Sequence, residues 1–556
     1  MTETRTHLRI KRAATEKEAI FLYDLLIKNG TVVDGTGKKR YRADVAVQDG
    51  MIAHIAPSIT EPAKRTLDAQ GLIVSPGFID YHSHSDNAVL LAPDSYNYLE
   101  QGVTTQITGQ CGGGPAPVYE DVAYRGQYGL SEEIWQKLLA ARADFKSFMD
   151  YVSGLTFGTN YAFYIPHGNV RGKVMYYSPE KPSETQMDEM KALVRQAMEC
   201  GYLGMTSGLV YAPSVYGDVN ELAELCKVVA EYQGSYASHI RGEGDKLVSS
   251  VAEALEVGRK ANVPVIVSHL KVLGLHNKGK SAVIIKMIAD ANAEGRTVHA
   301  DQYPFLAGSA PFIAQIPPKF LTEGKEALLE RLKDPAFRQT VENSIFQDTE
   351  EFQSSIYEAG YDGCFMVSAD ATPQYVGKNI GEIARAEGKK PIDVACDILI
   401  ANAGDVQGIY FSQNNDDMMN IIAQPFVMGG SDWSDYVVHR DAEQVSGGHP
   451  RGTGTMTRRL QLLRDHGLLT LEDAVHSITG LPAETSGLDG IGVLQEGMRA
   501  DITVFDYAGI QCNADFTYPF RKNSGIHYVV VGGAVAVENG NATGVKNGSI
   551  LKKHKK

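Results

Sequence analysis

The 556-residue chain lacks the long apolar runs of a membrane protein. No stretch approaches the roughly 20 apolar residues that would span a bilayer. Residues 1–18 are rich in charge, and the apolar run over 19–27 is short and interrupted by Asp24, unlike the core of a signal peptide. We therefore expect a cytoplasmic protein with no membrane partner.

Clustered cysteines and an excess of positive charge are also missing. The six cysteines form no CxxC motif, so no disulfide framework is expected, and we interpret all except Cys111 as buried small apolar residues. The formal net charge of −14 argues against a nucleic-acid partner, because phosphate binding needs concentrated Lys and Arg. The basic tail over 552–556 is expected to be a solvated terminus.

What remains is the composition of an ordinary globular protein, 43% hydrophobic and 22% charged. The chain is too long for a single hydrophobic core, which predicts one large domain and a smaller one. Short β-branched runs separated by Gly-rich turns occupy 22–75 and return over 485–550. We expect both segments to build one small β-sandwich domain, preceded by an N-terminal extension over 1–21.

Strand and helix signals alternate over residues 76–484, which predicts an α/β fold with a parallel sheet. A capping-box pattern at Ser183 and Gln186, for example, predicts a helix that ends at Gly201. Eight candidate strands favour a closed (β/α)8 TIM-like barrel, and they cover residues 79–84, 104–108, 161–165, 204–209, 235–240, 264–270, 297–303 and 425–431. About 120 residues separate the last two strands, so we predict an insertion over 306–420 that could lid the site.

Polar side chains stand at the ends of four of these strands. His82 and His84 end the first strand and, two residues apart, share one face of an extended chain. His239 and His269 close the fifth and sixth strands, and Asp432 follows the eighth. Functional side chains of such barrels lie at the C-terminal ends of the strands, so these five should converge on a divalent metal ion. A lone His-x-His pair would more often be structural, and the order of the whole set therefore carries the interpretation.

This order of ligands resembles the metal pattern of the amidohydrolase superfamily over about residues 22–506. Many relatives add a carboxylated lysine after the third or fourth strand, but no lysine stands there in this chain. Instead, Cys111 follows the second strand, where it resembles the bridging cysteine of the D-aminoacylase (N-acyl-D-amino-acid deacylase) family. Four further blocks are similar to that family, in its order: GLVYAP over 208–213, SHIRGE over 238–243, SHLK over 268–271 and YPFLAGS over 303–309.

The resemblance implies zinc-dependent hydrolysis of the amide bond of N-acyl-D-amino acids. We expect one tightly bound zinc ion at Cys111, His239 and His269, because a soft thiolate with two imidazoles suits zinc. A second ion at His82, His84 and Asp432, sharing Cys111, is left open. Asp432 would also act as the catalytic base, taking a proton from water and returning it to the leaving nitrogen.

The same resemblance assigns the substrate carboxylate to Lys271, Tyr303 and Ser309. Lys271 has independent support, because it lies two residues beyond His269 and so on the same face of an extended chain. Arg241 has the same relation to His239 and could either clamp a carboxylate or pair with Glu243.

Several alternatives stay open at this point. His167 and Arg171 are further candidates for lining the site. Three glycines follow Cys111 and a tryptophan follows Asp432, where the family usually has other residues, which leaves substrate size and shape undetermined. The competing functions are a cyclic-amide hydrolase of the hydantoinase or dihydroorotase kind and a non-catalytic scaffold on the same barrel. A small-molecule substrate is expected, and a homo-oligomer is compatible with the sequence.

Overall fold

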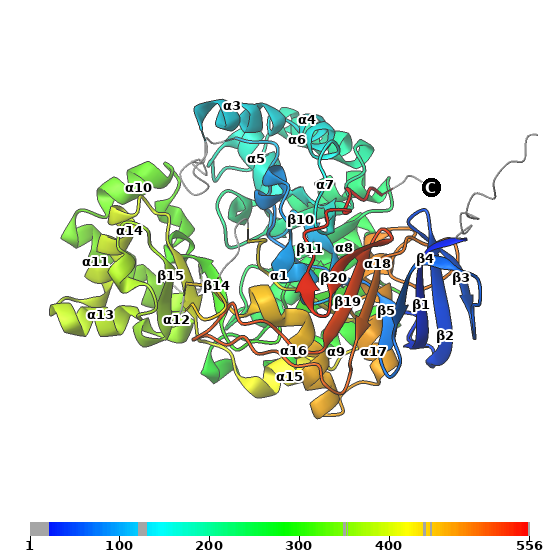
Figure 1. Cartoon of the computed structure of the whole chain (residues 1–556). Coiled ribbons are helices and arrows are strands. Elements are labelled where there is room, and N and C mark those ends of the chain that lie inside the picture. The colour runs from blue at the N-terminus through cyan, green and yellow to red at the C-terminus, as the bar shows by residue number, and fades with distance from the viewer. Residues whose placement is uncertain are drawn as a thin grey trace, which may run out of the picture.

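The computed structural model describes residues 22–119, 131–347, 352, 354–436, 441–444 and 447–553. The predicted N-terminal extension over 1–21 and the end of the basic tail lie outside these residues. Figure 1 shows a central α/β body with a β-sheet on one side, at β1 to β5, and a helical body on the other, at α10 to α14. In the described part of the chain, no helix is long and apolar enough to cross a membrane.

The central body is a parallel barrel whose eight strands follow the predicted order. The strands pair as two parallel sheets, β6-β7-β8 and β9-β10-β11-β12-β13-β17. Backbone hydrogen bonds join the sheets, with Tyr81 N donating to Gly429 O at 3.1 Å and Leu203 N donating to Phe163 O at 2.9 Å. The strands are β6 (Phe78–Asp80), β7 (Val103–Thr108), β8 (Asn160–Phe163), its continuation β9 (Ile165–Pro166), β10 (Gly204–Gly208), β11 (Ser235–His239), β12 (Val265–Val267), β13 (Val298–Gln302) and β17 (Val427–Gly429).

Helices alternate with these strands. The predicted capping box is present at the start of α6, where the Ser183 side chain accepts from Gln186 N and Gln186 bonds back to Ser183 N. The helices outside the insertion are α1 (Tyr96–Leu99), α3 (Glu132–Ala141), α4 (Phe145–Val152), α5 (His167–Met175), α6 (Glu184–Glu199), α7 (Val219–Ala230), α8 (Leu247–Ala261), α9 (Lys280–Ala293), α15 (Asn415–Ile422), α16 (Arg451–Asp465), α17 (Leu471–His476) and α18 (Gly480–Ser486).

The interior of the barrel is filled by side chains. Ile107, Ile266 and Met428 belong to one fully buried cluster with Tyr81 and Tyr164, whose hydroxyls lie 2.7 Å apart. Because this core blocks the axis, a site that needs solvent can form only at an end of the barrel.

Both ends of the chain contribute to one nine-stranded sheet. Strand β18 lies antiparallel to β5, with Val504 opposite Val74, and so joins the C-terminal strands to the N-terminal ones. Whether this sheet forms a separate β-sandwich domain stays a prediction. Its strands are β1 (Tyr23–Val32), β2 (Tyr41–Gln48), β3 (Met51–Ala56), β4 (Ala63–Asp68), β5 (Ile73–Pro76), β18 (Ile502–Phe505), β19 (Ile526–Val531), β20 (Ala534–Glu538) and β21 (Asn541–Ala542).

The segment between β13 and β17 carries its own small sheet, ordered β14-β16-β15, and its own apolar core, which includes Phe312, Ile345 and Leu399. In Figure 1 its helices stand apart from the barrel, at the left. The elements are β14 (Gly308–Pro311), the 3₁₀ helix η4 (Phe312–Gln315), α10 (Lys325–Arg331), α11 (Pro335–Gln347), α12 (Ser355–Ala359), β15 (Cys364–Ser368), α13 (Ile380–Glu387), α14 (Pro391–Ala401) and β16 (Gln407–Tyr410).

Candidate metal centre

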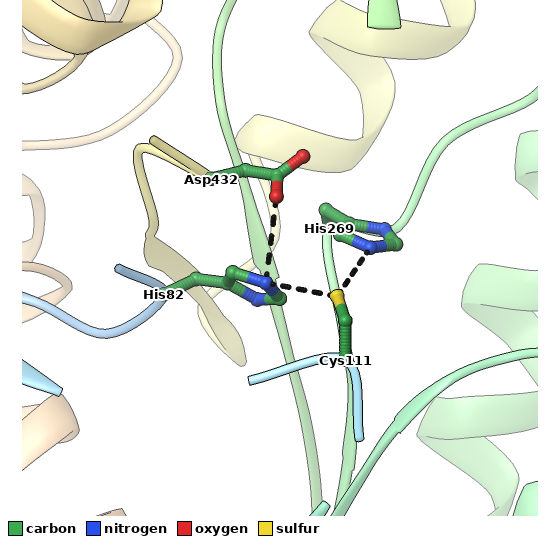
Figure 2. A group of neighbouring side chains, drawn as sticks. All are labelled: His82, Cys111, His269 and Asp432. Carbon is green, nitrogen blue, oxygen red and sulfur yellow. Dashed lines mark hydrogen bonds and ion pairs between the residues drawn. The ribbon is translucent and has the colours of Figure 1, made fainter. Parts of the chain in front are cut away.

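Four metal-ligating side chains converge beyond the C-terminal ends of the barrel strands. His82 follows β6, Cys111 follows β7, His269 follows β12 and Asp432 follows β17, and one ligand atom of each lies within 4.8 Å of the others. Figure 2 shows the imidazoles on either side of the thiol, with the Asp432 carboxylate above His82. Cys111 Sγ lies 3.3 Å from His82 Nε2 and 3.4 Å from His269 Nε2.

The other two predicted ligands adjoin this group. His84 Nε2 lies 3.1 Å from Asp432 Oδ1. His239 Nδ1 lies 3.0 Å from His269 Nε2, and both histidines form a second cluster of potential ligands with Glu243. The structure therefore brings all six predicted ligand side chains into one connected set.

Three of the six occupy a backbone conformation that L-residues seldom adopt. The φ angle is 52° at Cys111, 34° at His269 and 52° at Asp432. Such angles cost about 1–3 kcal/mol each and persist where the surrounding structure enforces them. Here His269 N donates to Asp301 Oδ1 at 2.9 Å, and Asp432 N donates to His82 O at 2.7 Å. Contacts within the site thus fix the backbone of its own ligands.

The turn that carries Cys111 packs directly against β10. Gly112 N donates to Thr206 Oγ1 at 3.2 Å, and Gly112 O accepts from Gly168 N at 2.9 Å. A Cβ atom at Gly208 would lie only 2.0 Å from the carbonyl oxygen of Cys111. A glycine at 208 is therefore required for the thiol to reach its place between the two imidazoles.

Buried carboxylates orient the two imidazoles that face the thiol. Both oxygens of Asp301 lie 3.1–3.3 Å from His82 Nδ1, and Glu243 Oε1 lies 3.0 Å from His269 Nδ1. Asp301 thus holds Nδ1 of His82, and Glu243 shares Nδ1 of His269 with Lys271 Nζ, which lies 2.6 Å from that nitrogen, so Nε2 of each ring faces Cys111. This is the second-shell arrangement that proteins use to fix metal-ligating histidines.

The electrostatics of the set favour the anionic form of two groups. Burial raises the pKa of the Cys111 thiol, but the charges of His82 and His269 outweigh burial and hold that pKa well below its usual range. Burial also raises the pKa of Asp432, and Arg451 is the main group that holds it well below its usual range instead. A thiolate and a carboxylate are the forms that a metal ion binds.

Arg451, the first residue of α16, was not found from the sequence. Its Nη1 lies 2.7 Å from Asp432 Oδ2, its Nη2 donates to Ser309 O at 3.2 Å, and its guanidinium lies 4.7 Å from the centre of the Tyr303 ring. It is 19 residues beyond Asp432, at no strand end. Asp301, by contrast, lies near the end of β13, where the strand-end rule could have found it.

A cavity of about 680 Å³, including its solvent-filled mouth, adjoins the candidate centre. Lys271 Nζ lies 2.5 Å from Glu243 Oε1, so its charge is paired within the cavity wall. The wall includes three predicted metal ligands and three predicted substrate residues: His239, His269, Asp432, Lys271, Tyr303 and Ser309.

Arg241 has a different environment. Its guanidinium donates to Glu253 at 2.9 Å and to the carbonyl oxygens of Val215 at 2.6 Å and Gly217 at 2.8 Å. Arg241 is not among the residues that line the described cavity, and its partner is Glu253, not Glu243. Its contact with substrate stays a prediction.

His167 and Arg171 also lie outside the lining of that cavity. His167 Nε2 lies 2.9 Å from Glu221 Oε1, and Arg171 Nε donates to the same oxygen at 3.1 Å. His167 Nδ1 lies 2.7 Å from Ser214 Oγ. All four side chains are buried, which indicates a structural network behind the site.

Comparison with known proteins gives consistent matches along the chain. The model of the amidohydrolase family matches residues 65–537. A D-aminoacylase of Alcaligenes xylosoxydans xylosoxydans is 32% identical over 533 residues, which cover 95% of this chain and 97% of the relative.

Solved structures agree with these matches. A D-aminoacylase crystal structure has a TM-score of 0.79 at 30% identity and covers 95% of this chain and all of the other. An N-acyl-D-glutamate deacylase from Bordetella bronchiseptica, complexed with zinc and a phosphonate inhibitor, has a TM-score of 0.76 at 29% identity over 95% of this chain and 99% of the other. An L-hydantoinase from Arthrobacter aurescens covers 96% of this chain and all of the other, but at 17% identity and a TM-score of 0.57 it shares the fold alone.

Proposed function

The chain belongs to the amidohydrolase family, and we propose that it hydrolyses the amide bond of N-acyl-D-amino acids, releasing a carboxylate and a free D-amino acid. One observation carries the proposal: the Cys111 thiol lies between His82 and His269, beside Asp432. This arrangement, in a chain 32% identical to a D-aminoacylase over nearly its whole length, supports the linear-amide chemistry of that relative.

Zinc is the cofactor that this donor set suits best. Ligand atoms about 2.0–2.3 Å from a tetrahedral zinc ion lie roughly 3.3–3.7 Å from one another. Cys111 Sγ meets this spacing toward His269 and also toward His82, while His239 Nδ1 lies 3.0 Å from His269 Nε2, a little inside that spacing. We propose that Cys111, His239 and His269 hold one zinc ion tightly.

The remaining ligands define where a second ion would bind. The Asp432 carboxylate lies between the two histidines that follow β6, with Oδ1 3.6 Å from His82 Nε2 and 3.1 Å from His84 Nε2. Cys111 also contacts His82, so its thiolate is placed to serve both positions. We propose His82, His84 and Asp432 as the second set, with Cys111 shared.

Bound zinc supplies Lewis acidity, which polarises the amide carbonyl and makes water acidic enough to attack near neutral pH. Asp432 is the proposed base: its carboxylate lines the cavity and is held in the anionic form by Arg451. It accepts the proton of the attacking water and passes that proton to the leaving nitrogen, so that the tetrahedral species collapses to a carboxylic acid and an amine.

Lys271, Tyr303 and Ser309 are proposed to bind the substrate carboxylate. All three line the cavity that also contains Asp432. Lys271 supplies the charge, and its Nζ lies 5.8 Å from the centre of the Tyr303 ring. An ammonium group held by Glu243 is preorganised, because the ion pair limits the rotamers that substrate binding must otherwise order.

The finer organisation of the chain is proposed on the same basis. Residues 306–420 act as an insertion that covers the site, since Gly308, Gln315, Ser355 and Tyr410 from this segment line the cavity. The sheet built from 22–75 and 485–550 is the small β-sandwich domain that accompanies the barrel of 76–484. The cytoplasmic location and a homo-oligomeric state stay predictions.

The proposal is tested by incubating the zinc-loaded protein with matched N-acetyl-D- and N-acetyl-L-amino acids and measuring the free amine released. We expect release from the D panel and a loss of about 100-fold or more in Asp432→Asn, which removes the base but keeps the side-chain volume. If the zinc-bound protein releases amine from neither panel, the deacylase function is rejected and cyclic amides become the proposed substrate class. A protein that purifies with no bound metal would instead favour the non-catalytic scaffold.

A further inference from the structure

The first turn of α5 lies directly behind the segment that carries Cys111. Gly168 N donates to Gly112 O at 2.9 Å, and the Asn169 side chain donates to Gly114 O at 2.8 Å. A Cβ atom at residue 168 would lie 2.6 Å from the same Gly112 oxygen, so the two backbones meet with no room for a side chain between them. The start of α5 therefore supports the turn from which the proposed zinc ligand projects.

His167, the first residue of α5, leads to a second support of the same turn. Its Nδ1 lies 2.7 Å from Ser214 Oγ, and Ser214 Oγ accepts from Gly208 N at 3.2 Å. A Cβ atom added at Gly112 would lie 3.2 Å from this same hydroxyl oxygen. The Ser214 hydroxyl thus lies where His167, β10 and the turn after Cys111 meet.

A buried carboxylate determines which nitrogen of His167 carries a proton. His167 Nε2 lies 2.9 Å from Glu221 Oε1, and Arg171 Nε donates to the same oxygen at 3.1 Å. Burial raises the pKa of Glu221, but these two neighbours hold that pKa below its usual range, so the carboxylate is an anion that accepts from Nε2. Nδ1 is then left to accept from the Ser214 hydroxyl, whose oxygen in turn accepts from Gly208 N.

A serine, a histidine and a glutamate in contact can also form the triad of a hydrolase. Here none of the three lines the described cavity, and all three are buried, with His167 0% and Ser214 2% exposed. Gly217 closes a further side, because a Cβ atom there would lie 2.8 Å from His167 Cε1. A substrate has no access to the Ser214 hydroxyl, so this chain of hydrogen bonds holds other groups in place.

We propose that His167 is a positioning residue for the Cys111 thiolate. It acts through Ser214, whose hydroxyl holds β10 against the turn after Cys111, and it is itself held by Glu221. This inference rests on the proposed zinc site and adds residues that contact neither the metal nor the substrate. Groups behind metal ligands commonly contribute about 10- to 100-fold in metal affinity, so loss of this support is measured as loss of zinc affinity.

The first test compares two buried serines. Ser214→Ala removes the hydroxyl next to His167. Ser235→Ala removes another hydroxyl that is also 2% exposed and also lies 2.7 Å from its partner, the Tyr164 hydroxyl. Ser235 begins β11, at the opposite end of that strand from His239. The zinc affinity of each protein is measured by titrating the zinc-loaded enzyme with a chelator of known affinity.

We expect zinc to bind about tenfold more weakly to Ser214→Ala than to the parent, and as tightly to Ser235→Ala as to the parent. The unfolding midpoints of the metal-free variants show how much stability each substitution removes. Equal zinc affinities in the two variants would overturn the inference, because the hydroxyl beside His167 would then have no particular effect on the metal site.

The second test separates the two contacts of His167. An asparagine amide lies near the position of Nδ1 and a glutamine amide near that of Nε2. His167→Asn therefore keeps the contact with Ser214, and His167→Gln keeps the contact with Glu221. We expect zinc to bind about fivefold more tightly to His167→Asn than to His167→Gln, which is the contribution of one hydrogen bond. Equal affinities, or the reverse order, would overturn the inference.

The third test observes the thiolate itself. In protein whose zinc is replaced by Co²⁺, a bound Cys111 thiolate gives a sulfur-to-cobalt charge-transfer absorption in the near ultraviolet. At full cobalt occupancy we expect this band to be weaker in Ser214→Ala than in Ser235→Ala, because a displaced sulfur overlaps less with the metal. A band of parental strength in both variants would overturn the inference and leave the zinc site intact. A parent protein without the band would overturn both together.

Discussion

Arg451 ties the proposed base to a permanent positive charge. Its Nη1 lies 2.7 Å from Asp432 Oδ2, and both side chains are almost fully buried. Burial by itself raises the pKa of Asp432, and a protonated carboxyl could accept no proton from water. The ion pair thus has a catalytic consequence besides its structural one: it keeps Asp432 in the form that the proposed mechanism needs.

We predict that Arg451→Met lowers kcat/KM by about 10- to 100-fold and moves the acidic limb of the pH profile to higher pH. The direction follows from the sign of the shift: without the guanidinium the pKa of Asp432 rises, so the base becomes protonated at a higher pH than in the parent. The measurement is kcat/KM across the acidic range for one N-acetyl-D-amino acid.

The control is Arg464→Met, near the end of the same helix, where the guanidinium binds the carbonyl oxygens of Tyr507, Ala508 and Ile510. It should leave the acidic limb in place. An acidic limb at the same pH in Arg451→Met and in the parent would mean that another group keeps Asp432 ionised.

At the residue scale, the sequence could name the candidate ligands because each stands at or just beyond a strand end. The rule that residues two apart in an extended chain point to the same face was less reliable for placing the proposed substrate residues. It assigned Lys271 and Arg241 to the same face as His269 and His239, yet Lys271 lines the cavity and Arg241 binds Glu253. The rule assumes an extended chain, but β11 ends at His239 and β12 ends before His269. Beyond those points, loop geometry decides where a side chain points, and a sequence pattern does not encode it.

At the scale of elements, β10 acts as the support for the turn after β7. A Cβ atom added at residue 208 would lie 2.0 Å from the carbonyl oxygen of Cys111 and 2.8 Å from its carbonyl carbon. Backbone atoms cannot move aside as the end of a flexible side chain can. Any larger residue at 208 must therefore displace Cys111 or separate the two strand ends.

We predict that Gly208→Ala lowers the zinc content and reduces activity by about 10- to 100-fold, since the displaced thiol can no longer face both imidazoles. Gly113→Ala is the matched control. It lies in the same turn as Cys111 but is exposed, with the nearest atom to its added Cβ 4.0 Å away. Zinc content by elemental analysis and amine release are measured for both variants. Equal zinc content in both would contradict the supporting role of β10.

The sequence predicted the order of the barrel strands correctly but made several too long. The expected strand over 264–270 is seen as β12 (Val265–Val267), and the one over 79–84 as β6 (Phe78–Asp80). In both segments the sequence features that predict a strand continue past the end of the observed strand, into the polar residues that follow it. The backbone nevertheless leaves the strand there, because the site requires conformations such as φ 34° at His269. The errors therefore fall at the candidate functional residues.

At the scale of the whole molecule, length alone indicated that residues 306–420 had to carry structure of their own. It could not indicate which structure. The helices α11 and α14 pack around a core that includes Val341 and Leu399, and their sequences give no sign of which partner they face. Pairing of the two chain ends through β5 and β18 was easier to predict, because both ends repeat the same β-rich composition.

The candidate ligands lie at or just beyond the ends of strands from both parallel sheets of the barrel. These strands are β6 and β7 in one sheet and β11, β12 and β17 in the other. A bound ion would therefore join the two sheets. Since the unfolded chain lacks this site, we predict that zinc raises the thermal unfolding midpoint by several degrees. A ligand at about 1,000 times its Kd contributes about 4 kcal/mol to stability.

The measurement is the unfolding midpoint of the metal-free protein with and without added zinc, followed by circular dichroism. Cys111→Ser should lose most of the zinc-dependent increase, because a hydroxyl is a poor zinc ligand. Cys200→Ser should keep it, since Cys200 caps the end of α6, away from the cavity. If zinc stabilises Cys111→Ser as much as Cys200→Ser, the ion does not bind between the sheets through the thiolate, and the assignment of Cys111 as a ligand fails.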